Sequence, residues 1–139
     1  RIIGQAGRDK LRGGAGEDTI NGGAQNDTIV GDGGNDMLHG DGGNDLISGG
    51  EGDDNLNGSH GSDTVLGNSG RDVLRGGAHA DLLIGGDGLD RILGQGSNRD
   101  TLVGGDGGTD EPDDDRFDRA AEVDNAFAID TAILERLNF

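Results

Sequence analysis

Aspartate recurs along this chain at a strict spacing of nine residues. The regularly spaced residues are Asp9, Asp18, Asp27, Asp36, Asp45, Asp54, Asp63, Asp72, Asp81 and Asp90. Carboxylates are hard oxygen ligands that suit Ca²⁺ and Mg²⁺. Glycosidase chemistry also uses paired carboxylates, but at one place in a protein. Identical carboxylates repeated along the sequence therefore predict a series of similar cation sites.

The composition excludes several other functions. Acidic residues outnumber Lys and Arg by 28 to 11, and the formal charge of −17 argues against nucleic-acid binding. The chain has no Cys, and His39, His60 and His79 fall at three different places in the repeat, so a zinc site is not expected. No stretch approaches the roughly 18 apolar residues of a membrane span. We find no motif for a catalytic nucleophile and predict that the chain is not an enzyme.

Two further residue classes keep step with the aspartates. An aliphatic residue follows each Asp by two places, from Leu11 and Ile20 to Ile92. Glycine precedes each Asp by five places, at Gly4, Gly13, Gly22, Gly31, Gly40, Gly49, Gly58, Gly67, Gly76 and Gly85. The unit reads G-G-x-G-x-D-x-U-x, where U is aliphatic, and we number its places from the first Gly. We expect a three-residue strand at x-U-x and a six-residue turn before it.

Such a repeat predicts a solenoid in which two units make one coil of 18 residues. Parallel strands would then stack about 4.8 Å apart, with a thin core of U side chains between two sheets. Alternate turns fall on the same edge, so one edge carries Asp9, Asp27, Asp45, Asp63 and Asp81, and the other Asp18, Asp36, Asp54, Asp72 and Asp90. Stacked carboxylates repel one another unless a cation lies between them.

The repeat resembles the calcium-binding nonapeptide of the repeats-in-toxin (RTX) family over about residues 1–110. The resemblance implies an all-β fold, a right-handed parallel β-roll with Ca²⁺ held between turns on the same edge. It also implies a secreted, extracellular, bacterial protein that leaves the cell by type I secretion.

Counting the gaps between stacked turns predicts about eight or nine Ca²⁺. Five Asp per edge leave four gaps per edge, and Asp100 would close a ninth. The predicted ligands are the ten repeat aspartates and Asp100, with Gly13, Gly22, Gly31, Gly40, Gly49, Gly58, Gly67, Gly76 and Gly85 in the turns. Mg²⁺ fits such loose, carbonyl-rich turns less well because it demands near-ideal octahedral geometry. Eight or nine Ca²⁺ would nearly cancel the charge of −17, so we expect the metal-free chain to be unfolded.

Some units depart from the pattern. Gln25 and His79 replace the fourth-place Gly and would be strained if that place requires positive φ. The second-place Gly is replaced by Asp32, Asp41, Ser59, Asn68 and Gln95, which we expect on exposed turns. Asn26, Asn35, Asn44 and Asp53 precede a ligand Asp, where they act either as turn formers or as further ligands.

Three segments follow from this pattern. Residues 1–105 form the roll, with Leu102–Val103 as its last strand and Arg1–Ile3 as the strand of an interrupted first repeat. Residues 106–118 are an acidic linker or irregular turn. Residues 119–139 are almost free of Gly and form a C-terminal cap, an export signal or an assembly contact.

Our leading hypothesis is an extracellular calcium-binding module that folds when it meets Ca²⁺. One alternative is a structural subunit that associates end to end into a fibre. Another is the accessory tail of a secreted enzyme, within a longer parent chain. The partners expected are calcium ions, with no nucleic acid and no membrane span.

Overall fold

We describe a computed structural model of the chain, which covers residues 1–96, 98–105, 111–112, 119–121 and 136–137. Its strands are β1 (Ile2–Ala6), β2 (Lys10–Ala15), β3 (Thr19–Ala24), β4 (Thr28–Gly33), β5 (Met37–Gly42), β6 (Leu46–Glu51), β7 (Asn55–His60), β8 (Thr64–Ser69), β9 (Val73–Ala78), β10 (Leu82–Asp87), β11 (Arg91–Leu93), β12 (Thr101–Val103), β13 (Glu111–Pro112) and β14 (Arg119–Ala121). No helix of the described residues has the length and apolar character to span a membrane.

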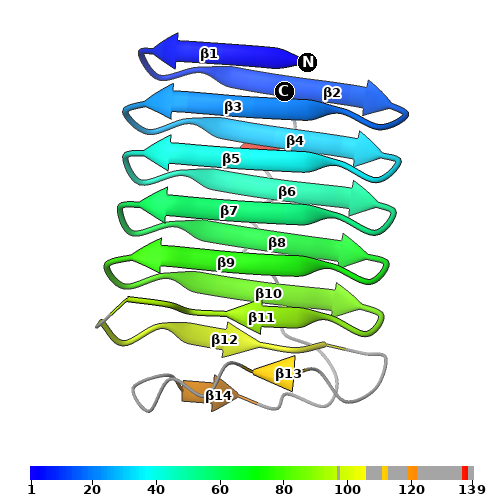
Figure 1. The fold of residues 1–139 in the computed structure, drawn as a ribbon, viewed down its shortest axis with the longest axis vertical. Coiled ribbons are helices and arrows are strands. Elements are labelled where there is room, and N and C mark those ends of the chain that lie inside the picture. Colours follow the sequence, from blue (N-terminus) through cyan, green and yellow to red (C-terminus); the bar gives the residue numbers. More distant parts are fainter. Residues whose placement is uncertain (97, 106–110, 113–118, 122–135, 138–139) are drawn as a thin grey trace.

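The strands form two parallel seven-stranded sheets, as the repeat predicts. Odd-numbered strands stack in the order β1 to β13 and even-numbered strands in the order β2 to β14. Among the strands from β1 to β10, paired residues are 18 positions apart in the sequence, for example Leu11 and Ile29. The chain therefore winds as a solenoid in which each coil adds one strand to each sheet (Figure 1). The predicted parallel β-roll is confirmed.

The strands are longer than predicted. In the regular coils they have six residues, and only three residues remain for each turn. The second and third places still pair with the neighbouring coil, as Gly14 does with Asp32 and Ala15 with Gly33. The expectation of three-residue strands was wrong because backbone pairing resumes directly after the first-place Gly.

A single line of aliphatic side chains fills the space between the two sheets. The U residues from Ile20 to Leu102 form this cluster, and Ile2 and Leu11 pack against it partly buried. Eight of them, from Ile20 to Leu83, have no exposed surface. Only one residue in nine contributes to this core, so contacts outside it must help to hold the coils together.

The solenoid continues beyond the strand that we expected to be its last. β13 pairs with β11, and β14 pairs with β12, both in parallel. The prediction that Leu102–Val103 ends the roll was therefore wrong. Most of the expected linker, 106–118, and most of the expected cap, 119–139, lie outside the described residues.

Candidate metal sites in the turns

The repeat aspartates form two hydrogen-bonded columns, one along each edge of the roll. From Asp27 onward, Oδ1 of each column Asp accepts a hydrogen bond from the backbone N–H of the Asp one coil earlier. In the middle of the roll, Asp63 Oδ1 lies 2.8 Å from the nitrogen of Asp45 in this way. The other accepting residues are Asp27, Asp36, Asp45, Asp54, Asp72, Asp81, Asp90 and Asp100, at 2.8–2.9 Å. These bonds confirm the predicted membership of the two edges.

Asp100 joins the first edge although its turn is one residue longer. It is completely buried, and its Oδ1 accepts a hydrogen bond from the N–H of Asp81 at 2.8 Å. The irregular residues before Asp100 therefore leave the column intact, with Asp100 in the place that a regular repeat would give it.

The second carboxylate oxygen is buried beneath the turns. In the columns, Oδ2 has no hydrogen-bond partner and almost no exposed surface in Asp9, Asp27, Asp36, Asp45, Asp54, Asp63 and Asp72. A buried, unsatisfied carboxylate oxygen costs free energy unless another group compensates it. Repetition of this feature in successive coils points to a group that the turns are built to receive.

A cradle for that group lies beside each first-place Gly. A Cβ added to Gly13 would lie 2.8 Å from Asp18 Oδ2 and 2.8 Å from the carbonyl oxygen of Gly31, one coil away. At Gly22 the corresponding distances are 2.5 Å to Asp27 Oδ2 and 2.9 Å to the oxygen of Gly40. A carboxylate and a main-chain carbonyl from adjacent coils thus converge where any side chain would intrude. This oxygen-rich arrangement fits a hard cation.

The same contacts recur at every first-place Gly predicted as a ligand. A Cβ at each of these glycines would lie close to Oδ2 of the Asp five residues later and to a glycine carbonyl one coil later. The glycines are Gly13, Gly22, Gly31, Gly40, Gly49, Gly58, Gly67, Gly76 and Gly85. Three glycines outside the predicted set share the arrangement. Gly4 has the same neighbours, and the carbonyls of Gly94 and Gly104 complete the cradles of Gly76 and Gly85. Gly4 was detectable by its register, whereas the extra residue before Asp100 shifts Gly104 out of the nine-residue spacing.

Side chains alone do not complete these sites. Among the described residues, no group of three or more His, Asp or Glu side chains comes close enough to hold a metal ion. Main-chain oxygens must therefore supply a large share of any coordination, as the Gly-rich turns suggest.

A second, exposed ladder runs outside the aspartate columns. Oδ1 of Asn26 accepts a hydrogen bond from the backbone N–H of Asn44, one coil later. In the same way, Asn35 accepts from the N–H of Asp53, and Asn44 accepts from the N–H of Ser62. Asp53 accepts from the N–H and the guanidinium of Arg71, and these bonds lower the pKa of its carboxyl. The residues before the repeat aspartates therefore connect coils, which supports their interpretation as turn formers.

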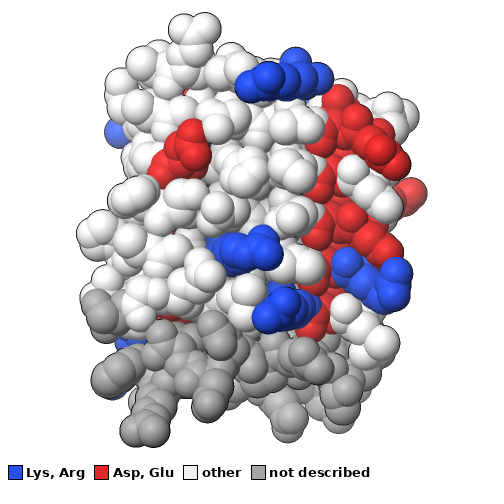
Figure 2. Space-filling model, viewed as in Figure 1, with Lys and Arg blue, Asp and Glu red and all other residues white. Residues whose placement is uncertain are grey.

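Burial opposes ionisation of the inner carboxylates when no cation is present. Desolvation is the main cause that raises the pKa of Asp45, Asp54 and Asp63 to about 6 and that of Asp72 to about 7. Neighbouring carboxylates raise the pKa of Asp72 further. Figure 2 shows acidic side chains gathered along one edge of the roll, where the turns lie. A bound cation would relieve both desolvation and mutual repulsion.

Positive φ is required at the second and fourth places of the repeat. Gln25 and His79, at the fourth place, have φ of 79° and 84°, so the condition for their predicted strain is met. The second-place substitutes also have positive φ, for example Asp32 at 79° and Asn68 at 81°. Asp32, Asp41, Ser59 and Asn68 lie within strands, so the expectation that they lie on turns was wrong. Asn and Asp tolerate this conformation better than other non-Gly residues.

Comparison with known families decides which repeat this is. The family model for the RTX calcium-binding nonapeptide repeat (4 copies) matches residues 1–29, 30–65 and 57–92. The chain belongs to the RTX calcium-binding repeat family. The comparisons with curated proteins and with solved structures gave no match. RTX membership makes the chain a calcium-binding β-roll, and the buried oxygens of its turns are chemically suited to that ion.

We expect the metal-free RTX chain to become more ordered as the pH falls from 7 towards 4. The folded pKa of Asp72 is about 7 against an ordinary value of 3.8, so the folded state binds more protons between these values. Protonation therefore stabilises the metal-free fold; this stability is complete below about pH 3.8 and is lost as the pH rises through 6–7. Far-UV circular dichroism in chelator measures the change. A β-signal that is constant or decreases on acidification would contradict it.

Replacing His79 by Gly should stabilise the calcium-loaded protein by about 1 kcal/mol, because Gly adopts positive φ without strain. The matched control is His60→Gly, at a position without positive φ, which should destabilise it by about 0.5–1 kcal/mol. Urea unfolding of both variants in saturating Ca²⁺ measures the difference. Equal loss of stability in the two variants would show that φ at His79 carries no strain.

Proposed function

We propose that this RTX module binds one Ca²⁺ in each gap between successive turns on the same edge. The proposed ligands are the repeat aspartates with Asp100, and the carbonyl oxygens of the first-place glycines. The single observation that supports this most strongly is the buried Oδ2 of the aspartates, which lies beside a carbonyl from the adjacent coil.

The number of gaps sets the proposed stoichiometry. With Asp100 included, the first edge has five gaps between aspartates and the second has four, which gives nine sites. The tenth cradle, at Gly85, joins Asp90 to the carbonyl of Gly104 and has no described Asp in the next coil, so it is not counted. Nine Ca²⁺ carry a charge of +18, against the formal −17 of the chain. Binding at all sites would therefore remove most of the self-repulsion of the metal-free protein.

Calcium binding and folding are, in this proposal, one process. The core contributes one aliphatic side chain per nine residues, and the inner carboxylates resist ionisation in the folded coil. At neutral pH without Ca²⁺, folding would bury these charges uncompensated. The turns exist only when coils stack, so binding energy becomes folding energy. Ca²⁺ is abundant outside cells and scarce in the cytosol, so we propose that the module folds after secretion and acts by binding rather than catalysis.

Titration of Ca²⁺ into chelated protein tests this proposal. We expect little β-structure at pH 7.5 in chelator and a cooperative gain of β-signal by circular dichroism as Ca²⁺ is added. Mg²⁺ at the same concentrations should produce much less, because the turns cannot offer its octahedral geometry. A chain that is already folded in chelator would refute the coupling.

A single added methyl group should distinguish the cradle from other glycine positions of the repeat. The Cβ of Gly31→Ala would collide with Asp36 Oδ2 and with the carbonyl of Gly49, whereas a Cβ at Gly33 meets nothing within 4 Å. We expect Gly31→Ala to lose at least one bound Ca²⁺ per chain by isothermal titration calorimetry, and to shift the folding midpoint to higher Ca²⁺. Gly33→Ala should behave as the wild type. Equal behaviour of the two variants would argue against the cradle as the calcium site.

A further inference from the structure

The outward-facing residues of the two sheets differ in chemistry. The ninth place of the repeat follows the core residue and points to the outer face of the sheet. In the odd-numbered sheet, the ninth places of β3, β5, β7 and β9 are Asn21, His39, Asn57 and Arg75, with Ile3 and Leu93 at the same place on β1 and β11. In the even-numbered sheet they are Arg12, Val30, Ser48, Leu66 and Ile84. We call the outer surface of β4, β6, β8, β10 and β12 the even face; it is largely apolar.

The even face is buried although the sheet has only one core side. Leu46 has no exposed surface, and Leu66 and Ile84 are 2% and 7% exposed. On the odd-numbered sheet, by contrast, the outward-facing Met37 is 45% exposed and Asn57 is half-buried. A sheet cannot cover its own outer face, so the burial of these side chains calls for a cover on the even face.

One described residue near the C-terminus contacts this face. Leu137 is partly buried against a second cluster of buried residues, which comprises Leu46, Leu66, Ile84 and Val103 and is separate from the line of U residues. These residues come from β6, β8, β10 and β12, so the cluster runs along the axis of the roll and not across its end.

The length of the chain permits this contact. Four strand spacings separate β14 from β6, which is about 19 Å at about 4.8 Å per strand. The sixteen residue steps from Ala121, the end of β14, to Leu137 span about 24 Å even at the compact rise of a helix. The chain between β14 and Leu137 is therefore long enough to return along the even face.

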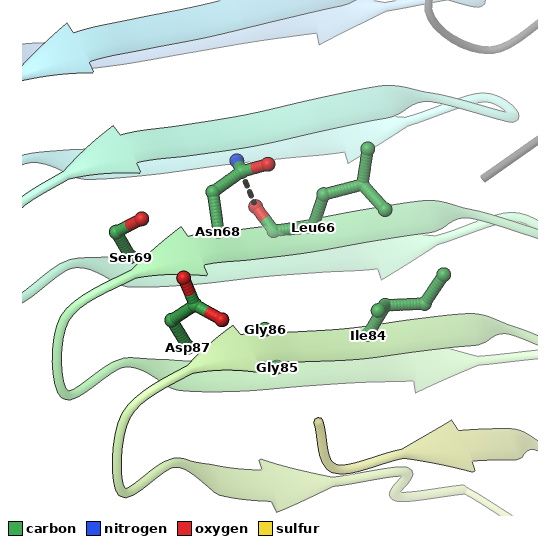
Figure 3. Close-up of a pocket in the computed structure, with 7 residues that line it drawn as sticks. All are labelled: Leu66, Asn68, Ser69, Ile84, Gly85, Gly86 and Asp87. Atoms are coloured by element: carbon green, nitrogen blue, oxygen red, sulfur yellow. Dashed lines mark hydrogen bonds between the residues drawn. The ribbon is translucent and has the colours of Figure 1, made fainter. Parts of the chain in front are cut away.

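The turn end of the even face is hollowed. A cavity of about 250 Å³ is bounded by Leu66 and Ile84 on neighbouring strands and by Asn68 and Asp87 towards the turn. Figure 3 shows the two apolar side chains on β8 and β10, with the polar ones nearer the turn. The apolar surface thus has a polar border on this side, as expected for a docking surface that stops short of the calcium turns.

We propose that the even face is a docking surface for the C-terminal segment of this chain, residues 122–139. The segment anchors through Leu137 on the cluster of Leu46, Leu66, Ile84 and Val103. It thereby shields from water an apolar stripe that runs across several coils. This is a lateral cover, distinct from a cap on the last coil, and it gives the apolar residues of this segment a partner within the same molecule.

Hydrogen exchange in saturating Ca²⁺ tests the proposal on the full chain. Peptides from residues 122–139 should be protected in the wild type. Leu66→Asp places a charge beneath the segment and should raise their exchange rate by about tenfold or more. The matched control, Asn57→Asp, adds the same charge at the same repeat place on the odd-numbered sheet and should leave the exchange unchanged.

A second variant keeps the test decisive if Leu66→Asp does not fold. Leu137→Asp lies outside the coils and should release the same peptides while circular dichroism still reports a folded roll. It should also increase binding of an apolar fluorescent dye, because the even face becomes exposed. Peptides 122–139 that exchange at the rate of an unstructured chain in the wild type, or that stay equally protected in Leu137→Asp, would overturn the proposal.

Discussion

The structure depends on one contact that repeats between coils, the contact made by each aspartate. One oxygen accepts a hydrogen bond from the backbone of the coil before, and the other is buried beside a glycine carbonyl. This arrangement leaves a charged oxygen without water, so it is stable only with a cation or a proton. The strict nine-residue spacing, the bare first-place glycine and the high acidity all follow from it.

The parts of the fold that this contact determines were predictable from the sequence. Asp27 and Asp45 stack because every coil has 18 residues, and Ile29 is buried because it follows Asp27 by two places. Asp100 also keeps its place in the column, although its turn is one residue longer. Each of these places is enclosed by neighbouring atoms and accepts few residue types, so it leaves a regular pattern in the sequence.

Features set by backbone conformation or by a longer period were missed. The side chains of Asp32 and Ser59 do not indicate that these residues have φ near 80°. The length of the six-residue strands depends on backbone pairing, which side-chain types do not specify. Val30, Leu66 and Ile84 of the apolar even face hold the ninth place of the repeat. Asn21, His39 and Asn57 of the other sheet hold the same place, so a nine-residue alignment of the repeats does not separate the two groups. Only an 18-residue frame separates the two sheets. β13 and β14 lie in sequence that has lost the repeat altogether.

Anomalous X-ray diffraction from crystals grown in Ca²⁺ tests the central claim most directly. We expect a row of calcium peaks along each edge, with every peak between an aspartate Oδ2 and a glycine carbonyl of the adjacent coil. An ordered roll whose turns hold only water at these positions would contradict it, because the coils would then be held by their thin apolar core and backbone pairing alone.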